Sequence, residues 1–386
     1  MKKAVIIPIY LRLNEPGELP KAQGLALAKR AINSLKVVAD QDFTLILPVC
    51  LDLGEKEEEA PWAELDGLLR EEIKLLRKER TLIFSPLHLK HLRGYLGQKH
   101  FSNFSNLIGL KGFSKIRNTG LLLAEAFGME VVVFLDNDEV VEDSNFLEIA
   151  CEYLNKKWNG KVVAGKGGFY INSDGAILLP PQHLWWRFLW DKTKWMNCVW
   201  ERILSSKERL VQSPMLLGGN LALHRDLFRR VPFDPRIPRG EDTDYLINAS
   251  HLGLSLFFDK ELRIKHLHPE RSEIYFEEEL KGDIERFLYE RGKTKATAQM
   301  DLDPYPGRFL KWTLYPRAAL TSLFLGVDYL VKGEWKKAGQ CITNMRLLLQ
   351  RQEGWSNYLE FRRDWERVMG EMQRAELNEI LESCRV

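Results

Sequence analysis

Short apolar runs alternate with segments of helical spacing along most of the chain. Runs rich in β-branched residues predict strands at 4–9, 43–49, 81–84, 130–135, 162–170 and 256–264. Helical spacing predicts helices at 21–39, within 55–80 and at 114–127, the last with Ser114 placed to cap its first turn. The segment 90–111 is rich in Gly, His, Asn and Lys, and we interpret it as a loop. Strands that alternate with helices predict an α/β fold, a mostly parallel sheet flanked by helices on both faces.

The pattern becomes wholly helical beyond Pro306, so we place a domain boundary near residue 300. This divides the chain into an α/β domain at 1–300 and a helical C-terminal region at 301–386. In the helical region, Trp312 and Tyr315 begin a series of apolar residues at helical spacing. We expect this face to pack on the first domain, or on a second copy of the chain in a homo-oligomer, rather than to enter lipid.

The composition, 45% hydrophobic and 28% charged, is that of a globular chain with a large core. A formal charge of +2 is too balanced to indicate a nucleic-acid-binding surface. The five cysteines are scattered and form no C-x-x-C pair, so we expect neither a disulfide framework nor a zinc site, and a cytoplasmic location fits best. The apolar stretch 318–331 is interrupted by polar residues and falls short of the ~20 residues of a membrane helix, so we expect membrane contact to be peripheral at most.

The run at 130–135 leads directly into Asp136-Asn137-Asp138-Glu139. Open α/β sheets bind their ligands at the carboxyl ends of such strands. Mg²⁺ and Mn²⁺ usually combine one or two carboxylates with substrate phosphates, so Asp136 and Asp138 are candidates to hold one of these ions and, through it, a nucleoside diphosphate. In an extended segment the two side chains point to the same side. The alternative is a solvated acidic loop that caps the next helix, but the preceding strand favours the metal site.

Several segments in a fixed order resemble the family-2-like glycosyltransferases of the GT-A fold. They are Val5-Ile6-Ile7-Pro8-Ile9-Tyr10, Gly112-Phe113-Ser114-Lys115-Ile116-Arg117, Val133-Phe134-Leu135-Asp136-Asn137-Asp138, Leu217-Gly218-Gly219-Asn220, Gly240-Glu241-Asp242 and Ile264-Lys265-His266-Leu267-His268. The resemblance implies a Rossmann-like GT-A domain that binds a nucleotide-sugar donor.

The resemblance also implies which residues bind this donor. It places Pro8 and Tyr10 at the nucleoside, Asp52 at the base, Arg117 at the base or diphosphate, and Asp136 at the diphosphate through the metal. The donor-sugar loop contributes Gly218, Gly219 and Asn220. The family usually has paired acids followed by Gly-Ser, whereas this chain has Leu51-Asp52-Leu53-Gly54, which leaves the identity of the base open. Simpler explanations are a surface arginine on a helix and a plain tight turn at the glycines.

The resemblance makes Asp242 the general base that deprotonates the acceptor hydroxyl, with Glu241 binding the acceptor or assisting. Helix N-termini favour carboxylates, so capping alone would explain one of these two acids. The resemblance further implies that His266 or His268 completes the metal site, and we prefer His266. A histidine satisfied by backbone hydrogen bonds is the alternative.

These residues predict a glycosyltransferase that moves a sugar from a UDP- or GDP-sugar to a hydroxyl acceptor with Mn²⁺ or Mg²⁺. Resemblance to family 2 implies inversion, although the length and helical tail also resemble retaining GT-A enzymes that make glucosyl- or mannosyl-glycerate. A nucleotidyltransferase would favour a Gly-rich basic loop after the first strand, where this chain has Tyr10-Leu11-Arg12-Leu13. A non-catalytic nucleotide-sugar-binding protein is a further alternative, against which the intact acidic and histidine positions count. The tryptophans between 185 and 200 are expected to pack in the core, although indole rings also stack on sugars.

Overall fold

The computed structural model describes residues 1–13, 22, 24–54, 61–74, 80–180, 185–267, 276–296, 301–350 and 354–386, without the side chains of 186 and 187. The strands are β1 (Lys3–Ile6), β2 (Ile9–Arg12), β3 (Thr44–Asp52), β4 (Thr81–Phe84), β5 (Val131–Phe134), β6 (Glu139–Val140), β7 (Lys157–Trp158), β8 (Lys161–Ile171), β9 (Leu210–Val211), β10 (Leu221–His224) and β11 (Ser255–His266). The α-helices of the first 300 residues are α1 (Leu25–Ser34), α2 (Trp62–Lys74), α3 (Pro86–Gln98), α4 (Ser102–Ser105), α5 (Phe113–Ala126), α6 (Phe146–Cys151), α7 (Lys192–Ser205), α8 (Arg225–Phe228), α9 (Glu241–His251) and α10 (Phe276–Ala296). They are followed by α11 (Gly307–Leu310), α12 (Leu314–Val331), α13 (Trp335–Leu347), α14 (Gly354–Glu371) and α15 (Asn378–Ser383), and short 3₁₀ helices are η2 (Leu35–Val37), η4 (Trp185–Leu189) and η5 (Ala375–Leu377).

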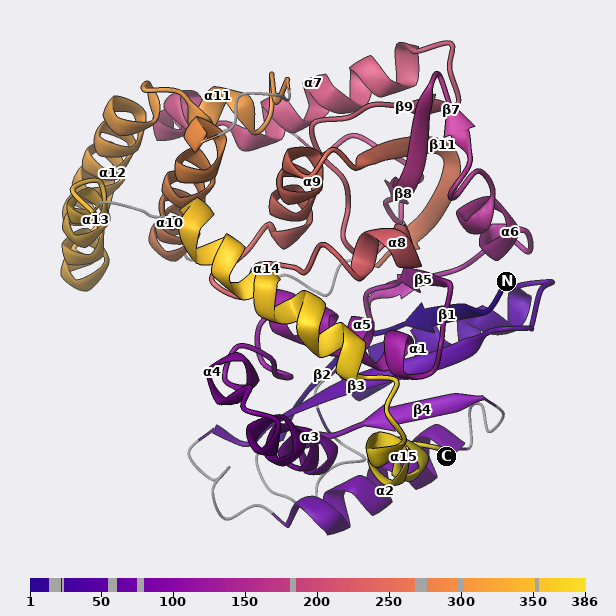
Figure 1. Cartoon of the computed structure of the whole chain (residues 1–386). Helices are drawn as coiled ribbons and strands as arrows, with labels where there is room; N and C mark the ends of the chain where they lie inside the picture. Colours follow the sequence, from indigo (N-terminus) through magenta and orange to yellow (C-terminus); the bar gives the residue numbers. More distant parts are fainter. Residues whose placement is uncertain are drawn as a thin grey trace.

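The strands of the described residues form one sheet in the order β2-β3-β1-β5-β10-β8-β11-β6, with β4 beside β3, β7 beside β8 and β9 beside β11. Strand β1 pairs in parallel with both β3 and β5, and β8 pairs in parallel with β11, while β10 is antiparallel to both β5 and β8. Helices flank this sheet, and a helical region follows it in the chain (Figure 1). The predicted α/β fold, with a mostly parallel sheet and a helical C-terminal region, is therefore confirmed.

The first predicted strand is observed as two short strands on one path. Ala4 lies opposite Thr44 and Ile9 lies opposite Val49, so β1 and β2 keep the same register beside β3. Pro8 stands between them, and proline has no backbone N–H to continue a ladder of hydrogen bonds. The path of the chain is thus that of one strand, interrupted before Tyr10.

Two hydrophobic cores cover the two faces of the sheet, as the alternation of side chains in a strand requires. In β1, Ala4 and Ile6 point to a core shared with α3, α5, α9 and α14. The intervening Val5 belongs to a core shared with α1, α2 and α6. Helix α5 approaches the sheet closely, because a Cβ built on Gly120 would lie only 2.7 Å from Ile6 Cγ2. This close packing fixes the helix that carries Arg117.

Two local predictions were wrong. The segment 90–111, interpreted as a loop, contains most of α3 and all of α4. Helix α3 begins after Ser85, whose backbone and hydroxyl both meet His88 Nδ1 in a capping box, and it buries Leu92 and Leu96 among other residues. Ser114 does not cap α5, since this helix begins one residue earlier, after Gly112.

The C-terminal helices return to the α/β part of the chain. Helix α14 crosses the molecule in Figure 1, and its Trp365 donates a hydrogen bond from Nε1 to the Phe228 carbonyl at 2.9 Å. Past α15, the Cys384 carbonyl accepts a hydrogen bond from the Ile83 amide of β4 at 2.8 Å. Among the described helices, none combines the length and hydrophobicity needed to cross a bilayer. The predicted domain boundary near residue 300 falls outside the described residues and stays a prediction.

Candidate functional site

The acidic segment lies at the carboxyl end of β5, in the middle of the sheet. The Asp136 amide donates to Glu139 Oε2 at 2.8 Å, and the Glu139 amide donates back to the Asp136 carbonyl at 3.1 Å, so the chain turns tightly here. Strand β6 then pairs antiparallel with the end of β11, which sets Glu139 opposite His266. The acidic segment and the end of β11, more than a hundred residues apart in sequence, thereby lie side by side at one edge of the sheet.

Asp138 and His266, two of the predicted metal ligands, meet at this edge. His266 Nε2 lies 3.4 Å from Asp138 Oδ2, and both side chains are partly exposed. The Tyr170 ring stacks on the imidazole at 5.0 Å between centroids and limits its orientation. In the part of the chain that the structure describes, no group of three or more His, Cys, Asp or Glu side chains is arranged to hold a metal ion. His268, the other predicted histidine, lies outside that part.

Arg117 is buried at the centre of the site and joins four of the predicted segments. From α5 it donates to Asp136 Oδ1 at 2.7 Å, to the Gly218 carbonyl at 2.9 Å and to Glu241 Oε1 at 3.2 Å. Burial alone would lower the pKa of this guanidinium, but the carboxylates of Asp136 and Glu241 outweigh that effect and raise it. Arg117 therefore stays charged, and only 3% of its side chain is exposed.

The loop before β10 leaves no space for side chains at its two glycines. A Cβ on Gly218 would lie 2.9 Å from Arg117 Nη2, and one on Gly219 would lie 2.6 Å from Asp136 Oδ2 and overlap the Glu139 carboxylate. The Gly219 amide donates to the Tyr170 hydroxyl at 2.8 Å. The backbone of this loop thus lies directly against the acidic segment.

Asn220, which the sequence predicts to bind the donor, is fully buried. Its amide Nδ2 donates to the Phe169 carbonyl of β8 at 3.1 Å and to the Leu262 carbonyl of β11 at 3.4 Å. In the structure its side chain supports the sheet beneath the loop.

Helix α9 begins at Glu241, beside the glycine loop, as the sequence predicts. Gly240 precedes it with a φ of +72°, a conformation that glycine adopts without strain. Asp242 is partly exposed, and its two carboxylate oxygens accept hydrogen bonds from the Gly218 amide at 3.2 Å and the Thr243 amide at 2.6 Å. Glu241 is buried against Arg117, and burial raises its pKa. The two acids therefore occupy different environments, one in contact with solvent and one inside an ion pair.

Tyr10 of β2 and Asp52, the last residue of β3, are predicted to contact the nucleoside and lie together. The Tyr10 hydroxyl donates to Asp52 Oδ2, and Lys111 Nζ lies 3.2 Å from Asp52 Oδ1. The hydrogen bond from Tyr10 holds the pKa of Asp52 below its usual value, while burial and Asp52 raise the pKa of Tyr10 to about 12. Half-buried Pro8 lies just before this strand.

A cavity of about 370 Å³ adjoins this cluster at the end of β3. Lys111 lines it together with Leu51, Trp62 and three further cations, Lys90, Arg93 and Lys115. An aromatic and apolar wall beside several cations suits a ring system that carries an anionic group.

Sequence reasoning missed several residues that complete the site. Glu139 stands in the acidic segment itself, and burial, reinforced by the Asp136 charge, raises its pKa well above the ordinary value. Tyr170 is the next-to-last residue of β8, and no sequence motif identifies it. Arg286 of α10 packs on Gly240 so closely that a Cβ there would overlap its guanidinium, which brings a buried cation next to the start of α9. These residues come from elements whose proximity only the fold reveals.

No protein-family model matches the chain, and a search of curated proteins gave no match. Solved structures do resemble it over most of its length. The mannosyltransferase PcManGT from Pyrobaculum calidifontis, in complex with GDP-Man and Mn²⁺, gives a TM-score of 0.49 at 13% identity, covering 97% of this chain and 87% of its own. TarS from S. aureus gives 0.41 at 12% identity, with coverages of 90% and 55%. Glucosyl-3-phosphoglycerate synthase from Mycobacterium tuberculosis, in complex with Mn²⁺, uridine-diphosphate and phosphoglyceric acid, gives 0.39 at 15% identity, with coverages of 74% and 76%. Because these TM-scores are below 0.5, the proposal that follows rests on the residues of this chain.

Proposed function

We propose that the chain is a divalent-metal-dependent glycosyltransferase that moves a sugar from a UDP- or GDP-sugar to a hydroxyl acceptor. The observation that supports this most directly is the meeting of Asp138 and His266 at the carboxyl edge of the sheet, beside the Arg117–Asp136 pair and the glycine loop. A partly exposed carboxylate, Asp242, contacts the same loop from α9. The Asp136 carboxylate, a candidate metal ligand, and the candidate base Asp242 thus both border the glycine loop.

The residues fit a hard divalent cation. Neighbouring ligands of an octahedral ion with bonds of about 2.1 Å lie about 3 Å apart, close to the 3.4 Å between Asp138 Oδ2 and His266 Nε2. Such ions commonly take the rest of their ligands from substrate phosphates and water, which agrees with a site of few protein ligands. Asp138 and His266, with Asp136 beside them, would hold Mn²⁺ or Mg²⁺, which when bound would neutralise charge on the departing diphosphate.

The chain's own residues prepare the donor side of the site. Arg117 holds the Asp136 carboxylate and the Gly218 carbonyl in fixed positions, so that the acidic segment and the glycine loop keep their spacing. The absence of a side chain at Gly219 lets the backbone of the glycine loop lie directly against the Asp136 and Glu139 carboxylates. Tyr10, Asp52 and Lys111 form the group assigned to the nucleoside end.

Asp242 is the proposed general base. Its oxygens each accept one backbone hydrogen bond, which orients the carboxylate and leaves further lone pairs for the acceptor hydroxyl. A base on the acceptor side favours single displacement with inversion. NMR of the product is expected to show an inverted anomeric centre, and a retained centre would remove this role from Asp242.

Thermal-shift measurements with UDP, GDP, UDP-sugars and GDP-mannose, each with and without Mn²⁺, test the proposal. We expect one nucleotide series to raise the melting temperature in a metal-dependent manner. Asp138→Ala should lose the metal-dependent part, whereas Asp242→Asn should keep it and lose nucleotide release in the presence of acceptors. Glu142→Gln serves as a matched control, because this exposed carboxylate pairs only with Lys265 among the described residues. No shift with any nucleotide, or full activity of Asp138→Ala, would overturn the proposal.

A further inference from the structure

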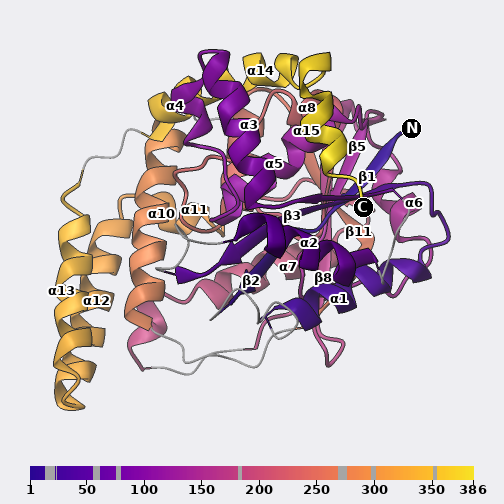
Figure 2. The same cartoon turned by 90° about the horizontal axis from the view of Figure 1, so that it is seen from below.

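Exposed apolar side chains gather on one part of the molecule. Among the described residues, eighteen large apolar side chains are exposed, and ten of them lie between 312 and 349. Two more, Trp185 and Phe188 of η4, pack against Phe324 of α12 with ring centroids 5.7 Å and 6.0 Å away. Figures 1 and 2 both place the paired helices α12 and α13 at the end of the molecule opposite the N-terminus. We call this region, α12 and α13 with η4, the hairpin surface.

The apolar side chains form a continuous stripe on α12. Leu320, Leu323, Val327 and Leu330 follow one another at three- and four-residue steps and are each 42–48% exposed. The opposite face of the helix, with Leu325 and Tyr329, is buried. The stripe therefore points away from the protein core and has no partner within the described part of this chain. The expectation that this face packs on the first domain is thus wrong for these residues.

The stripe continues onto the turn between the two helices. Val331 is 84% exposed and Trp335 is 71% exposed, which is far beyond what a folded chain requires of such residues. Ile342 and Leu349 follow Trp335 at seven-residue steps and extend the exposed face along α13. A surface of this kind normally marks a site of interaction.

The hairpin surface is also strongly basic. Between residues 305 and 350 the chain has seven Lys or Arg and two Asp or Glu, whereas the whole chain has a net charge of only +2. Arg308, Arg317, Lys336 and Arg346 have no acidic partner among the described residues. At the start of α12, Arg202 joins Arg308, Lys311 and Arg317 around a cavity of about 330 Å³. Asp303, which pairs with Lys311, is the one acidic residue in this lining, so the cations outnumber it four to one. Burial, and then the charge of Arg308, lower the pKa of Arg317, as expected where cations crowd together.

We propose that the hairpin surface docks on an anionic lipid bilayer. An apolar stripe with tryptophan at its ends and Lys and Arg around it has the composition of a segment that lies in the membrane interface. Charge complementarity selects the occupant, because a second copy of the chain would set two basic surfaces against each other, whereas an anionic leaflet attracts both. Docking would place the protein at a membrane surface. This proposal does not depend on the reaction that the chain catalyses.

Flotation of the full chain with vesicles tests this proposal. We expect little binding to phosphatidylcholine alone, strong binding when phosphatidylglycerol is added, and loss of that binding at high salt. Lys336→Gln combined with Arg346→Gln should weaken binding about 25-fold, since each surface cation contributes roughly 5-fold near an anionic membrane. Leu323→Ser combined with Val327→Ser should abolish it.

Leu204→Ser is the matched control, because Leu204 is 41% exposed but lies on α7 outside the hairpin surface. All of these variants change exposed side chains, and their melting temperatures should equal that of the wild type. Failure of the wild type to float with anionic vesicles would overturn the proposal, as would undiminished binding of Leu323→Ser/Val327→Ser. A wild-type dimer that this variant converts to a monomer would identify a second copy as the occupant and would equally overturn it.

Discussion

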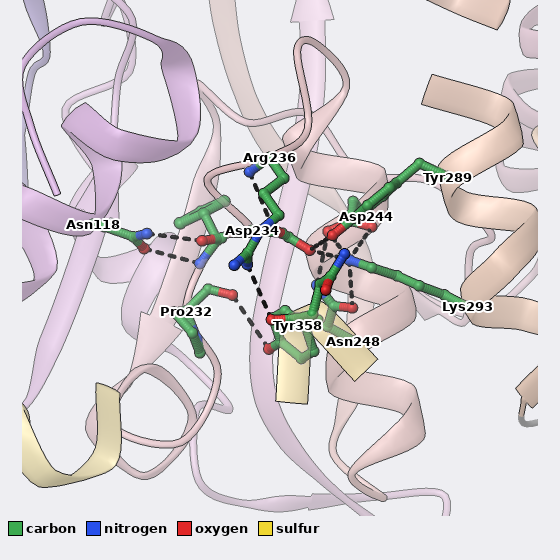
Figure 3. A network of polar contacts seen from close by, with 11 residues as sticks. Asn118, Pro232, Asp234, Arg236, Asp244, Asn248, Tyr289, Lys293 and Tyr358 are labelled. Atoms are coloured by element: carbon green, nitrogen blue, oxygen red, sulfur yellow. Dashed lines mark hydrogen bonds and ion pairs between the residues drawn. The ribbon is translucent and has the colours of Figure 1, made fainter. Parts of the chain in front are cut away.

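Replacing Lys293 tests how the C-terminal half of the chain is held together. Its ammonium group is fully buried in α10, 2.7 Å and 2.8 Å from the two oxygens of Asp244 and 2.8 Å from Asp234 Oδ2. The rings of Tyr289 and Tyr358 lie 5.0 Å and 4.6 Å from it (Figure 3). One cation therefore serves two buried carboxylates and two aromatic rings.

We predict that Lys293→Met lowers the free energy of unfolding by about 3–5 kcal/mol. Methionine has a similar volume, so the main cost is that of leaving two buried carboxylates without their cation. Burial already raises the pKa of Asp244 in the wild type, and without the ammonium group this pKa should rise further. A carboxyl group with a raised folded-state pKa takes up a proton more readily when folded than when unfolded. The deficit of the variant should therefore be largest above neutral pH and should shrink as the pH falls towards 5.

Urea unfolding followed by tryptophan fluorescence at pH 8 and pH 5 measures both effects. Adding Asp244→Asn to Lys293→Met should recover part of the stability, because the amide keeps the shape of the carboxylate and removes one unpaired charge. Lys295→Met is the control, since Lys295 is exposed two residues further along the same helix and its loss should cost less than about 0.5 kcal/mol. A Lys293→Met variant within about 1 kcal/mol of the wild type at pH 8, or a deficit that grows on acidification, would refute this account.

Three further predictions concern the site and its surroundings. Gly219→Ala should abolish nucleotide binding in calorimetry by pushing against Asp136, while Gly94→Ala, where a Cβ meets open space, should not. Arg117→Lys should cost about 2–3 kcal/mol in thermal or urea unfolding, because an ammonium group cannot reproduce the three contacts of the planar guanidinium. Burial lowers the pKa of His251 to about 4, so the unfolded chain takes up a proton first and stability should fall as the pH drops from about 6.5 towards 4. His251→Phe should remove roughly 1–2 kcal/mol of that loss, a range reduced for the partial exposure of the ring.

Strands in the middle of the sheet were predictable from sequence, because both of their faces are buried. Residues 131–134 form β5 within the predicted 130–135, since Val132 and Val133 contribute to cores on opposite faces of the sheet. Helix α3 was missed for a local reason. The His88 side chain caps its first turn, and histidine is not a typical signal for the start of a helix. The many polar residues of α3 also obscured the spacing of its buried residues.

The candidate site was predictable where its residues belong to segments with a recognisable order. Arg117, Asp136, Gly218 and Glu241 come from four such segments, and the structure brings them into direct contact. Lys111 and Arg286 were not predictable in this way. Lys111 pairs with Asp52 and Arg286 packs on Gly240, and no local pattern specifies either of these long-range contacts. Asn220 shows the opposite case, in which a polar residue in a suggestive loop turns its amide inward to the sheet.

Helix α9 connects the site to the C-terminal helices. Asp242 and Asp244 lie two residues apart, so they point to different sides of the helix. Asp242 contacts the glycine loop, while Asp244 binds Lys293 of α10, whose ammonium group also faces Tyr358 of α14. The first turn of α9 is thus held from both sides, by the acidic edge of the sheet and by a charge network that the C-terminal helices complete. The turn that carries the proposed base is therefore linked, through Asp244 and Lys293, to Tyr358 of the helical region.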